Sequence, residues 1–165
     1  MSTSEKNVVY ETISTEQWKE LASENMNIPV VMYTRGISMW PLLRADRDSV
    51  IMVNPDRPLK KGDIITFLRS DGKNVTHRIC KIDDQQIQTI GDNCDAPDEI
   101  ITHDKVIGLV THVNHNGREI SMDSKRWQFY GKTMIATNPV RMFVRNHMFR
   151  PVRHCLWRIV KGKKK

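Results

Sequence analysis

The 165-residue chain contains no run of eighteen consecutive apolar residues, and this absence predicts that no helix crosses a membrane. Its first residues lack the basic and apolar segments of a secretory signal, so we expect none. Aromatic residues make up only 7% of the chain and the mean hydropathy is negative. Together with the length, these features indicate one water-soluble domain of ordinary size that can bury a core.

Cysteine is scarce as well, and the cysteines that are present form no familiar pattern. Cys80, Cys94 and Cys155 are odd in number and have no Cys-x-x-Cys spacing. They therefore indicate free thiols in a reducing compartment rather than a disulfide framework. Cys94 has two interpretations, a secondary reactive thiol or a spectator, and we favour the spectator.

The sequence gives little support for a metal site. His112 and His115 have a spacing that can begin one, but no cysteine or third ligand lies nearby. The residues that follow, Asn116-Gly117, are typical of a β-hairpin turn. We therefore expect a hairpin here, and neither a metal nor another cofactor.

Acidic residues are absent from the last quarter of the chain. Residues 1–124 hold 14 lysines and arginines against 19 acidic residues, whereas residues 125–165 hold 12 basic residues and no acidic one. This division indicates an acidic body with a basic tail, and such tails bind nucleic acid, an anionic membrane or their own acidic body. Because the sequence has no helix-turn-helix region and no basic strand interleaved with aromatic residues, we expect no nucleic acid as a partner.

Alternating apolar residues from residue 30 onward predict a mainly β fold. Short segments with turn residues between them favour a compact antiparallel β domain at 29–124. Before it, we assign 1–28 to a helical segment, because residues 14–17 form a capping-box start and an apolar face follows in 18–22. The predicted strands are 30–34, 50–53, 64–68, 75–82, 86–90, 105–113 and 118–122.

The segment 125–165 predicts a basic α-helical tail in two parts. We expect Asn138-Pro139 and Arg150-Pro151 to interrupt its two helices, because proline lacks the N–H that a helix interior needs. Within 152–160 the apolar residues recur at helical spacing, with basic residues off that stripe. This pattern suits an anionic membrane surface, reached through residues 152–165. Packing of the stripe on the β domain is the alternative, with nearly equal weight.

Four short motifs follow one another along the chain. They are a Gly-x-Ser-Met-x-Pro motif around Ser38, a Lys-Gly-Asp turn before a strand, a strand-like segment around His77, and a Gly-Asp-Asn segment. In the last, Asp92 is followed six residues later by Asp98. A hydroxyl, an imidazole and a carboxylate are the groups that serine-based acyl transfer requires.

Each of these residues also has an ordinary structural explanation. A serine beside glycine and proline is usually a turn residue, a strand histidine usually fills a half-buried position, and the aspartates lie in a polar loop. Their joint occurrence in this order favours a peptidase-type site over those explanations. The α/β-hydrolase alternative is excluded, because its Gly-x-Ser-x-Gly turn needs glycine where this chain has Trp40.

From Gly36 to about Val113, the order of the motifs resembles the signal peptidase group of serine peptidases. Bacterial signal peptidases and the self-cleaving SOS repressors pair the serine with a lysine base. The endoplasmic-reticulum-type and archaeal enzymes instead have a histidine where this chain has His77. The resemblance implies the coiled, mostly β fold of that group.

The resemblance also implies a role for each candidate residue. Ser38 is implied as the nucleophile, and His77 as the general base and then the acid. Asp98 is implied as the carboxylate that orients the histidine, because of the six-residue spacing, with Asp92 as a close rival and Asp95 as the least favoured. A histidine base with an unperturbed pKa of about 6.5 would lose activity at about pH 6–7.

The expected function is therefore that of a serine endopeptidase that cleaves the leader or pro-segment of a peptide or protein substrate through an acyl-enzyme. The sequence departs from the group in two ways: Gly36 stands where many members have an oxyanion-binding serine, and no membrane anchor is evident. We expect slow turnover or one dedicated substrate, and a cytoplasmic location or a peripheral one on the inner membrane surface. The alternative is a non-catalytic regulatory protein on the same fold that binds nucleic acid or membrane.

Overall fold

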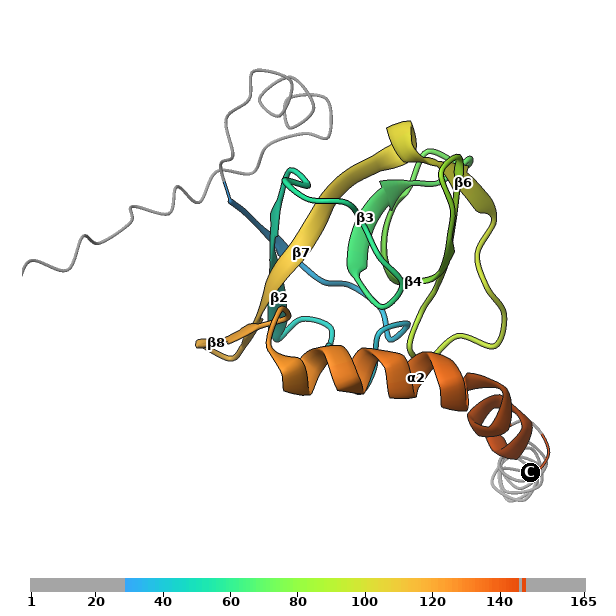
Figure 1. Ribbon diagram of the computed structural model, residues 1–165. Coiled ribbons are helices and arrows are strands. Elements are labelled where there is room, and N and C mark those ends of the chain that lie inside the picture. The colour runs from blue at the N-terminus through green and yellow to red at the C-terminus, as the bar shows by residue number, and fades with distance from the viewer. Residues whose placement is uncertain (1–28, 146, 148–165) are drawn as a thin grey trace, which may run out of the picture.

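The computed structural model describes residues 29–145 and residue 147, which form a mainly antiparallel β structure followed by one long helix (Figure 1). The prediction of a mainly β fold is confirmed. The helical segment predicted at 1–28, the break at Arg150-Pro151 and the apolar stripe at 152–160 lie outside the described residues. The elements are β1 (Val30–Tyr33), β2 (Asp48–Val53), β3 (Ile64–Leu68), β4 (Asn74–Ile82), β5 (Gln86–Ile90), β6 (Ile100–Thr102), the 3₁₀ helix η1 (His103–Lys105), β7 (Val106–His115), β8 (Arg118–Ser121) and α2 (Lys125–Val144).

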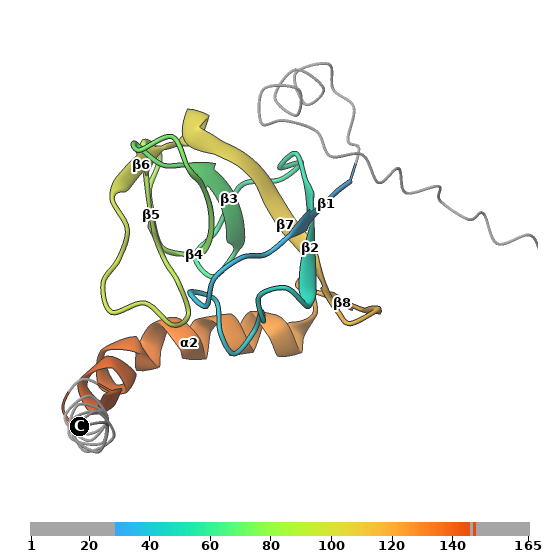
Figure 2. The same ribbon diagram turned by 180° about the vertical axis from the view of Figure 1, so that it is seen from behind.

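Seven strands lie side by side in the order β1-β2-β7-β3-β4-β5-β6, and β8 pairs with β7. All of these pairings are antiparallel. The long strand β7 lies between β2 and β3, so it joins the two halves of the sheet, which does not close because β1 and β6 stand at its ends. Both views show the sheet curling, with α2 lying across one end of it (Figures 1 and 2).

Two apolar clusters hold the sheet in this curled form. The first contains nine buried residues: Met39, Leu42, Leu43, Val50, Met52, Ile64, Ile107, Val110 and Val113. The second contains six: Ile65, Phe67, Ile79, Ile87, Ile101 and Leu109. Burial of a side chain of this size contributes about 1.5–3 kcal/mol. Because three members of the first cluster come from the loop between β1 and β2, that loop is anchored in the core.

The seven predicted strands are confirmed to within two residues at each boundary. The predicted hairpin is confirmed too: β7 ends at His115, and Asn116 and Gly117 adopt the positive φ angles of 49° and 90° that a tight hairpin turn requires. The sequence did not reveal β6, because this strand has three residues and buries only Ile101, which is too little for an alternating pattern.

The predicted helix break at Asn138-Pro139 is wrong, because α2 continues through Pro139 to Val144. A proline inside a helix costs about 3 kcal/mol, so packing must compensate. Pro139 itself is exposed, while one face of α2 is buried: Gly131, Met134, Asn138 and Met142. None of the helices in the described part of the chain is long and apolar enough to cross a membrane.

Candidate active site

Ser38 lies in the loop between β1 and β2, and a second loop fixes the main chain around it. Gly36 precedes it with a φ of 78°, a conformation that glycine adopts without side-chain strain. The main-chain N–H of Asn93 donates to the carbonyl of Ser38 at 2.6 Å, and the Asn93 side-chain amide donates to the carbonyl of Ile37 at 3.1 Å. Since Met39 is buried in the first apolar cluster, Ser38 is held from two sides.

His77 is buried in the middle of β4, opposite Ile65 of β3. Its Nδ1 lies 2.6 Å from Oδ2 of Asp98. Because the carboxylate accepts, the neutral imidazole carries its proton on Nδ1 and its lone pair on Nε2. This is the tautomer that a general base facing a serine hydroxyl needs.

Asp98 is itself held in place by Thr89 of β5. The Thr89 hydroxyl donates to Oδ2 of Asp98 at 2.7 Å, and the main-chain N–H of Asp98 donates to the carbonyl of Thr89 at 2.8 Å. Burial by itself would raise the pKa of the Asp98 carboxyl, but the hydrogen bonds from His77 and Thr89 lower it. Asp98 therefore remains an anion that can fix the imidazole.

The pKa of His77 is set by two opposed effects. Burial favours the neutral ring and lowers the pKa, whereas the hydrogen bond to Asp98 and the contact with the Cys94 thiol raise it. The second effect is the larger one in total and raises the pKa of His77 to about 9. The activity loss expected at pH 6–7 assumes an unperturbed histidine pKa of about 6.5. The pKa of His77 is higher than that, so the expected pH range does not apply to it.

Asp92 and Asp95 have other partners. The Asp92 carboxylate accepts two hydrogen bonds of 2.8 Å from the guanidinium of Arg78, and both side chains are almost fully buried. Asp95 is ion-paired with Arg145 of α2. Of the three candidate carboxylates, the structure brings only Asp98 to the imidazole of His77.

The Cys94 thiol lies close to Nε2 of the His77 imidazole. A Cβ at Gly91 would stand 2.6 Å from Sγ of Cys94, 2.8 Å from the carbonyl oxygen of Ser38 and 3.0 Å from Nε2 of His77. A side chain at position 91 would clash with these three atoms, so only glycine fits there. The sequence suggested that Cys94 is a spectator, but its contact with His77 raises the pKa of the imidazole.

Ser38, His77, Cys94 and Asp98 line one pocket of about 490 Å³. Its other walls come from the end of β1, the loop after it and the start of β4. Within the described residues, the imidazole is hydrogen-bonded to Asp98 through Nδ1, and no hydrogen bond joins it to the Ser38 hydroxyl. Lys73, the lysine four residues before His77 in the sequence, forms an ion pair with Asp71.

Sequence reasoning missed the residues of α2 that hold the loop at 91–95. Asn138 donates to the carbonyl of Cys94 at 3.3 Å, Arg141 to the carbonyl of Asp92 at 2.7 Å, and Arg145 to the carbonyl of Asn93 at 2.8 Å. The only signal in the sequence was that positions 138, 141 and 145 fall on one face of a helix. The target of that face depends on the fold, so the sequence could not reveal it.

Comparison with known proteins finds no family model and no curated protein that matches this chain.

Proposed function

We propose that the protein is a serine endopeptidase of the signal peptidase type, with Ser38 as nucleophile, His77 as base and Asp98 as the carboxylate that orients the base. The observation that carries this proposal is the 2.6 Å contact between His77 and Asp98, in a pocket that Ser38 also lines. A hydroxyl, an imidazole and a carboxylate from three separate segments thus meet at one cavity.

In the proposed reaction, Ser38 Oγ attacks the carbonyl carbon of the scissile peptide bond while Nε2 of His77 takes the hydroxyl proton. The tetrahedral intermediate collapses by breaking the C–N bond, and Nε2 returns that proton to the leaving amine. Water then attacks the acyl-enzyme, again with His77 as base, and Ser38 is released with its proton restored. Asp98 stabilises the imidazolium in each half of the reaction.

The oxyanion of the tetrahedral intermediate needs a hydrogen-bond donor, and residue 36 cannot supply one from a side chain. Because Gly36 has no hydroxyl, we propose the main-chain N–H of Ser38 as the donor. The hydrogen bonds from Asn93 to the carbonyls of Ser38 and Ile37 fix the orientation of this part of the main chain. Loss of one hydrogen-bond donor to the oxyanion lowers kcat by about 10²–10³-fold in enzymes of this kind. The glycine at position 36 therefore supports slow turnover on a dedicated substrate.

The substrate is proposed to lie as an extended strand beside β1. In the described part of the chain β1 is the terminal strand of the sheet and pairs with β2 alone, so its second edge can accept a strand. Met32 and Tyr33 at the end of β1, and Thr34 directly after it, line the pocket that holds Ser38. A peptide added at this edge would therefore lead directly to the nucleophile, and a leader or pro-segment is a peptide of this extended kind.

Cys94 is a rival nucleophile within the same pocket. Its thiol touches the imidazole, and a cysteine paired with histidine can also form an acyl-enzyme. A serine-reactive phosphonate distinguishes the two residues. We expect stoichiometric labelling of the wild-type chain and of Cys94→Ala, and none of Ser38→Ala. Labelling that persists in Ser38→Ala and disappears in Cys94→Ala would refute the role of Ser38.

Cleavage itself is tested with the natural peptides of cells that produce the protein. We expect new peptide N-termini to accumulate with the active protein and to be absent with Ser38→Ala. Circular dichroism of both proteins supplies the control that the variant is folded. A wild-type chain that neither reacts with the phosphonate nor generates new N-termini would favour the non-catalytic alternative.

A further inference from the structure

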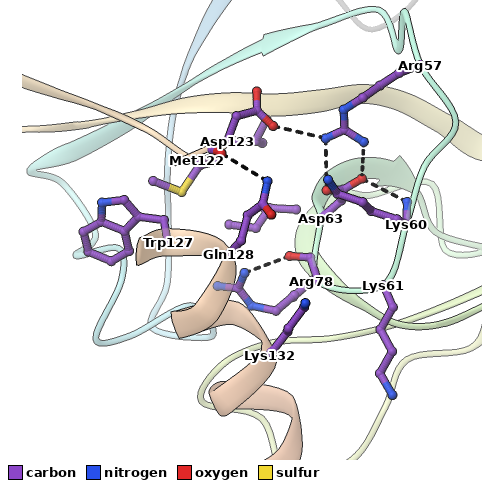
Figure 3. Close-up of a pocket in the computed structure, with 13 residues that line it drawn as sticks. Arg57, Lys60, Lys61, Asp63, Arg78, Met122, Asp123, Trp127, Gln128 and Lys132 are labelled. Carbon is purple, nitrogen blue, oxygen red and sulfur yellow. Dashed lines mark hydrogen bonds and ion pairs between the residues drawn. The ribbon is translucent and has the colours of Figure 1, made fainter. Parts of the chain in front are cut away.

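A second cavity, of about 180 Å³, lies between the β domain and the first half of α2 (Figure 3). Arg78, the residue after His77 in β4, lines it from the side of the sheet, and Trp127 and Lys132 line it from α2. Successive residues of a strand point to opposite faces, so this cavity and the pocket of His77 lie on different sides of β4. No residue proposed for catalysis lines it.

Positive charge predominates in this cavity. Five cationic side chains line it against two carboxylates, which leaves a net charge of +3. α2 cannot neutralise this positive charge, because residues 125–165 contain no acidic residue. The cations are Arg57, Lys60, Lys61, Arg78 and Lys132, and the carboxylates are Asp63 and Asp123.

Both carboxylates are bound by the same arginine. The guanidinium of Arg57 donates to the two oxygens of Asp63 at 2.7 and 3.1 Å and reaches Asp123 at 3.4 Å. Asp63 also accepts the main-chain N–H of Lys60 at 3.0 Å. Figure 3 shows these bonds gathered around Arg57, at the side of the cavity away from Lys132.

The surplus charge therefore belongs to the lysines. The charge of Arg78 is matched by Asp92, whereas no ion pair among the described residues involves Lys60, Lys61 or Lys132. The Arg78 guanidinium also passes close beneath α2, since a Cβ at Gly131 would stand 2.6 Å from its Nη1. Lys132, the residue after Gly131 in α2, extends toward Arg78 (Figure 3). Cations held around one cavity repel one another, and an anion between them would relieve that repulsion.

We propose that this cavity binds a phosphate-bearing anion through Lys132 and Lys61. With Asp92 counted against Arg78, a surplus of two positive charges remains, which favours a polyvalent anion, and a phosphate group carries up to two negative charges. The volume suits a phosphate or pyrophosphate group and is smaller than the roughly 300–1,000 Å³ of sites for larger ligands. This inference does not depend on peptidase activity, so its test and that of the proposed function can fail separately.

Titration of the full chain with sodium pyrophosphate, at constant low ionic strength, tests the proposal. We expect one saturable site by calorimetry and a change in tryptophan fluorescence, because Trp127 lines the cavity. Lys132→Ala and Lys61→Ala should each weaken binding at least about tenfold. Lys81→Ala is the matched control, since it removes an exposed lysine of β4 that does not line the cavity, and its affinity should stay unchanged. Equal weakening by Lys81→Ala and Lys132→Ala would indicate diffuse attraction and overturn the proposal.

A lipid headgroup offers the same phosphate chemistry as a small soluble compound, and vesicles separate the two sources. Vesicles with phosphatidylglycerol are compared with neutral phosphatidylcholine vesicles by cosedimentation. If Lys132→Ala weakens binding to the anionic vesicles and pyrophosphate competes with them, the ligand is a headgroup. If only pyrophosphate binding depends on Lys132, the ligand is a soluble phosphate compound. If neither depends on Lys132 in a variant that melts within about 3 °C of the wild type, the proposal is wrong.

Discussion

His77 and Arg78 are neighbours in β4, and each binds a carboxylate of the segment 91–98 on a different face of the strand. Nδ1 of His77 lies 2.6 Å from Asp98, and the guanidinium of Arg78 makes two bonds of 2.8 Å to Asp92. The alternation of a β-strand thus separates two charged pairs that are adjacent in sequence. One pair faces the pocket of Ser38, and the other is buried near α2.

The first prediction concerns Asp98, whose substitution should affect activity much more than stability. Asp98→Asn keeps the shape of the side chain but removes the charge that stabilises the imidazolium, so we expect kcat to fall about 10³–10⁴-fold. Asp95→Asn is the matched control, because Asp95 lies on the same segment and pairs with Arg145 on the surface. Steady-state peptide cleavage measures both. If the two variants lose activity equally, Asp98 does not orient His77.

The second prediction is that substitution of Asp92 affects stability much more than activity. Asp92→Asn leaves the buried guanidinium of Arg78 without its counter-charge, and the free energy of unfolding should fall by about 3 kcal/mol. Urea unfolding followed by circular dichroism measures the loss. A variant as stable as the wild type but inactive would instead give Asp92 a catalytic role.

The third prediction concerns the pH dependence of the proposed activity. The pKa of His77 is raised to about 9, and a protonated imidazole cannot accept the serine proton. kcat/KM should therefore decline as the pH falls below about 9, rather than at the pH 6–7 expected for an unperturbed histidine. Cys94→Ala removes a contact that raises this pKa, so its profile should shift to lower pH. An acid limb at the same pH in both proteins would contradict this account.

The raised pKa of His77 has a corresponding effect on stability. Its folded value of about 9 exceeds the unperturbed 6.5, so protonation favours the folded state. This contribution is fully present below pH 6.5 and is lost as the pH rises through about 9. The free energy of unfolding should therefore decline over that range, and by less in His77→Gln. An equal decline in both proteins would assign the effect to other groups.

The fourth prediction uses the thiol of Cys94 as a probe of the pocket. Alkylation by iodoacetamide adds bulk beside Nε2 of His77, where even a Cβ at position 91 would be too close to its neighbours, and should reduce activity more than tenfold. Cys80 is buried and donates to the carbonyl of Gln88, so it should remain unmodified. Mass spectrometry in a Cys155→Ser background identifies the labelled residue. Cys94→Ala should resist inactivation, and its inactivation by the same reagent would disprove the assignment.

The fifth prediction is that α2 positions the loop on which the proposed site depends. Arg145→Ala removes bonds to the carbonyl and side chain of Asn93, whose N–H holds the carbonyl of Ser38. A hydrogen bond from a charged donor contributes about 1.5–3 kcal/mol, so we expect kcat to fall at least about tenfold with a smaller change in KM. Lys125→Ala, at the start of the same helix, is the control and should leave both constants unchanged. Equal effects of the two substitutions would argue against a positioning role.

Local patterns in the sequence were sufficient to predict most strands and the hairpin after His115. Alternation of apolar residues and the turn residues Asn116-Gly117 act over a few positions, so these elements could be read before any tertiary contact was known. The motif order likewise identified Ser38, His77 and the segment with the aspartates as candidates. It could not choose among the aspartates, because their partners lie 14, 21 and 50 residues away.

The tertiary structure decided the remaining questions. It joined Asp98 to His77 and Asp92 to Arg78, and it packed α2 so that the helix continues through Pro139. It also raised the pKa of His77, because a carboxylate and a thiol meet at that ring only in the folded chain and together outweigh the opposing effect of burial. The sequence by itself determined which local elements form and which chemical groups are present. The distances between those groups, and hence their charges and pairings, depend on long-range packing that no local pattern encodes.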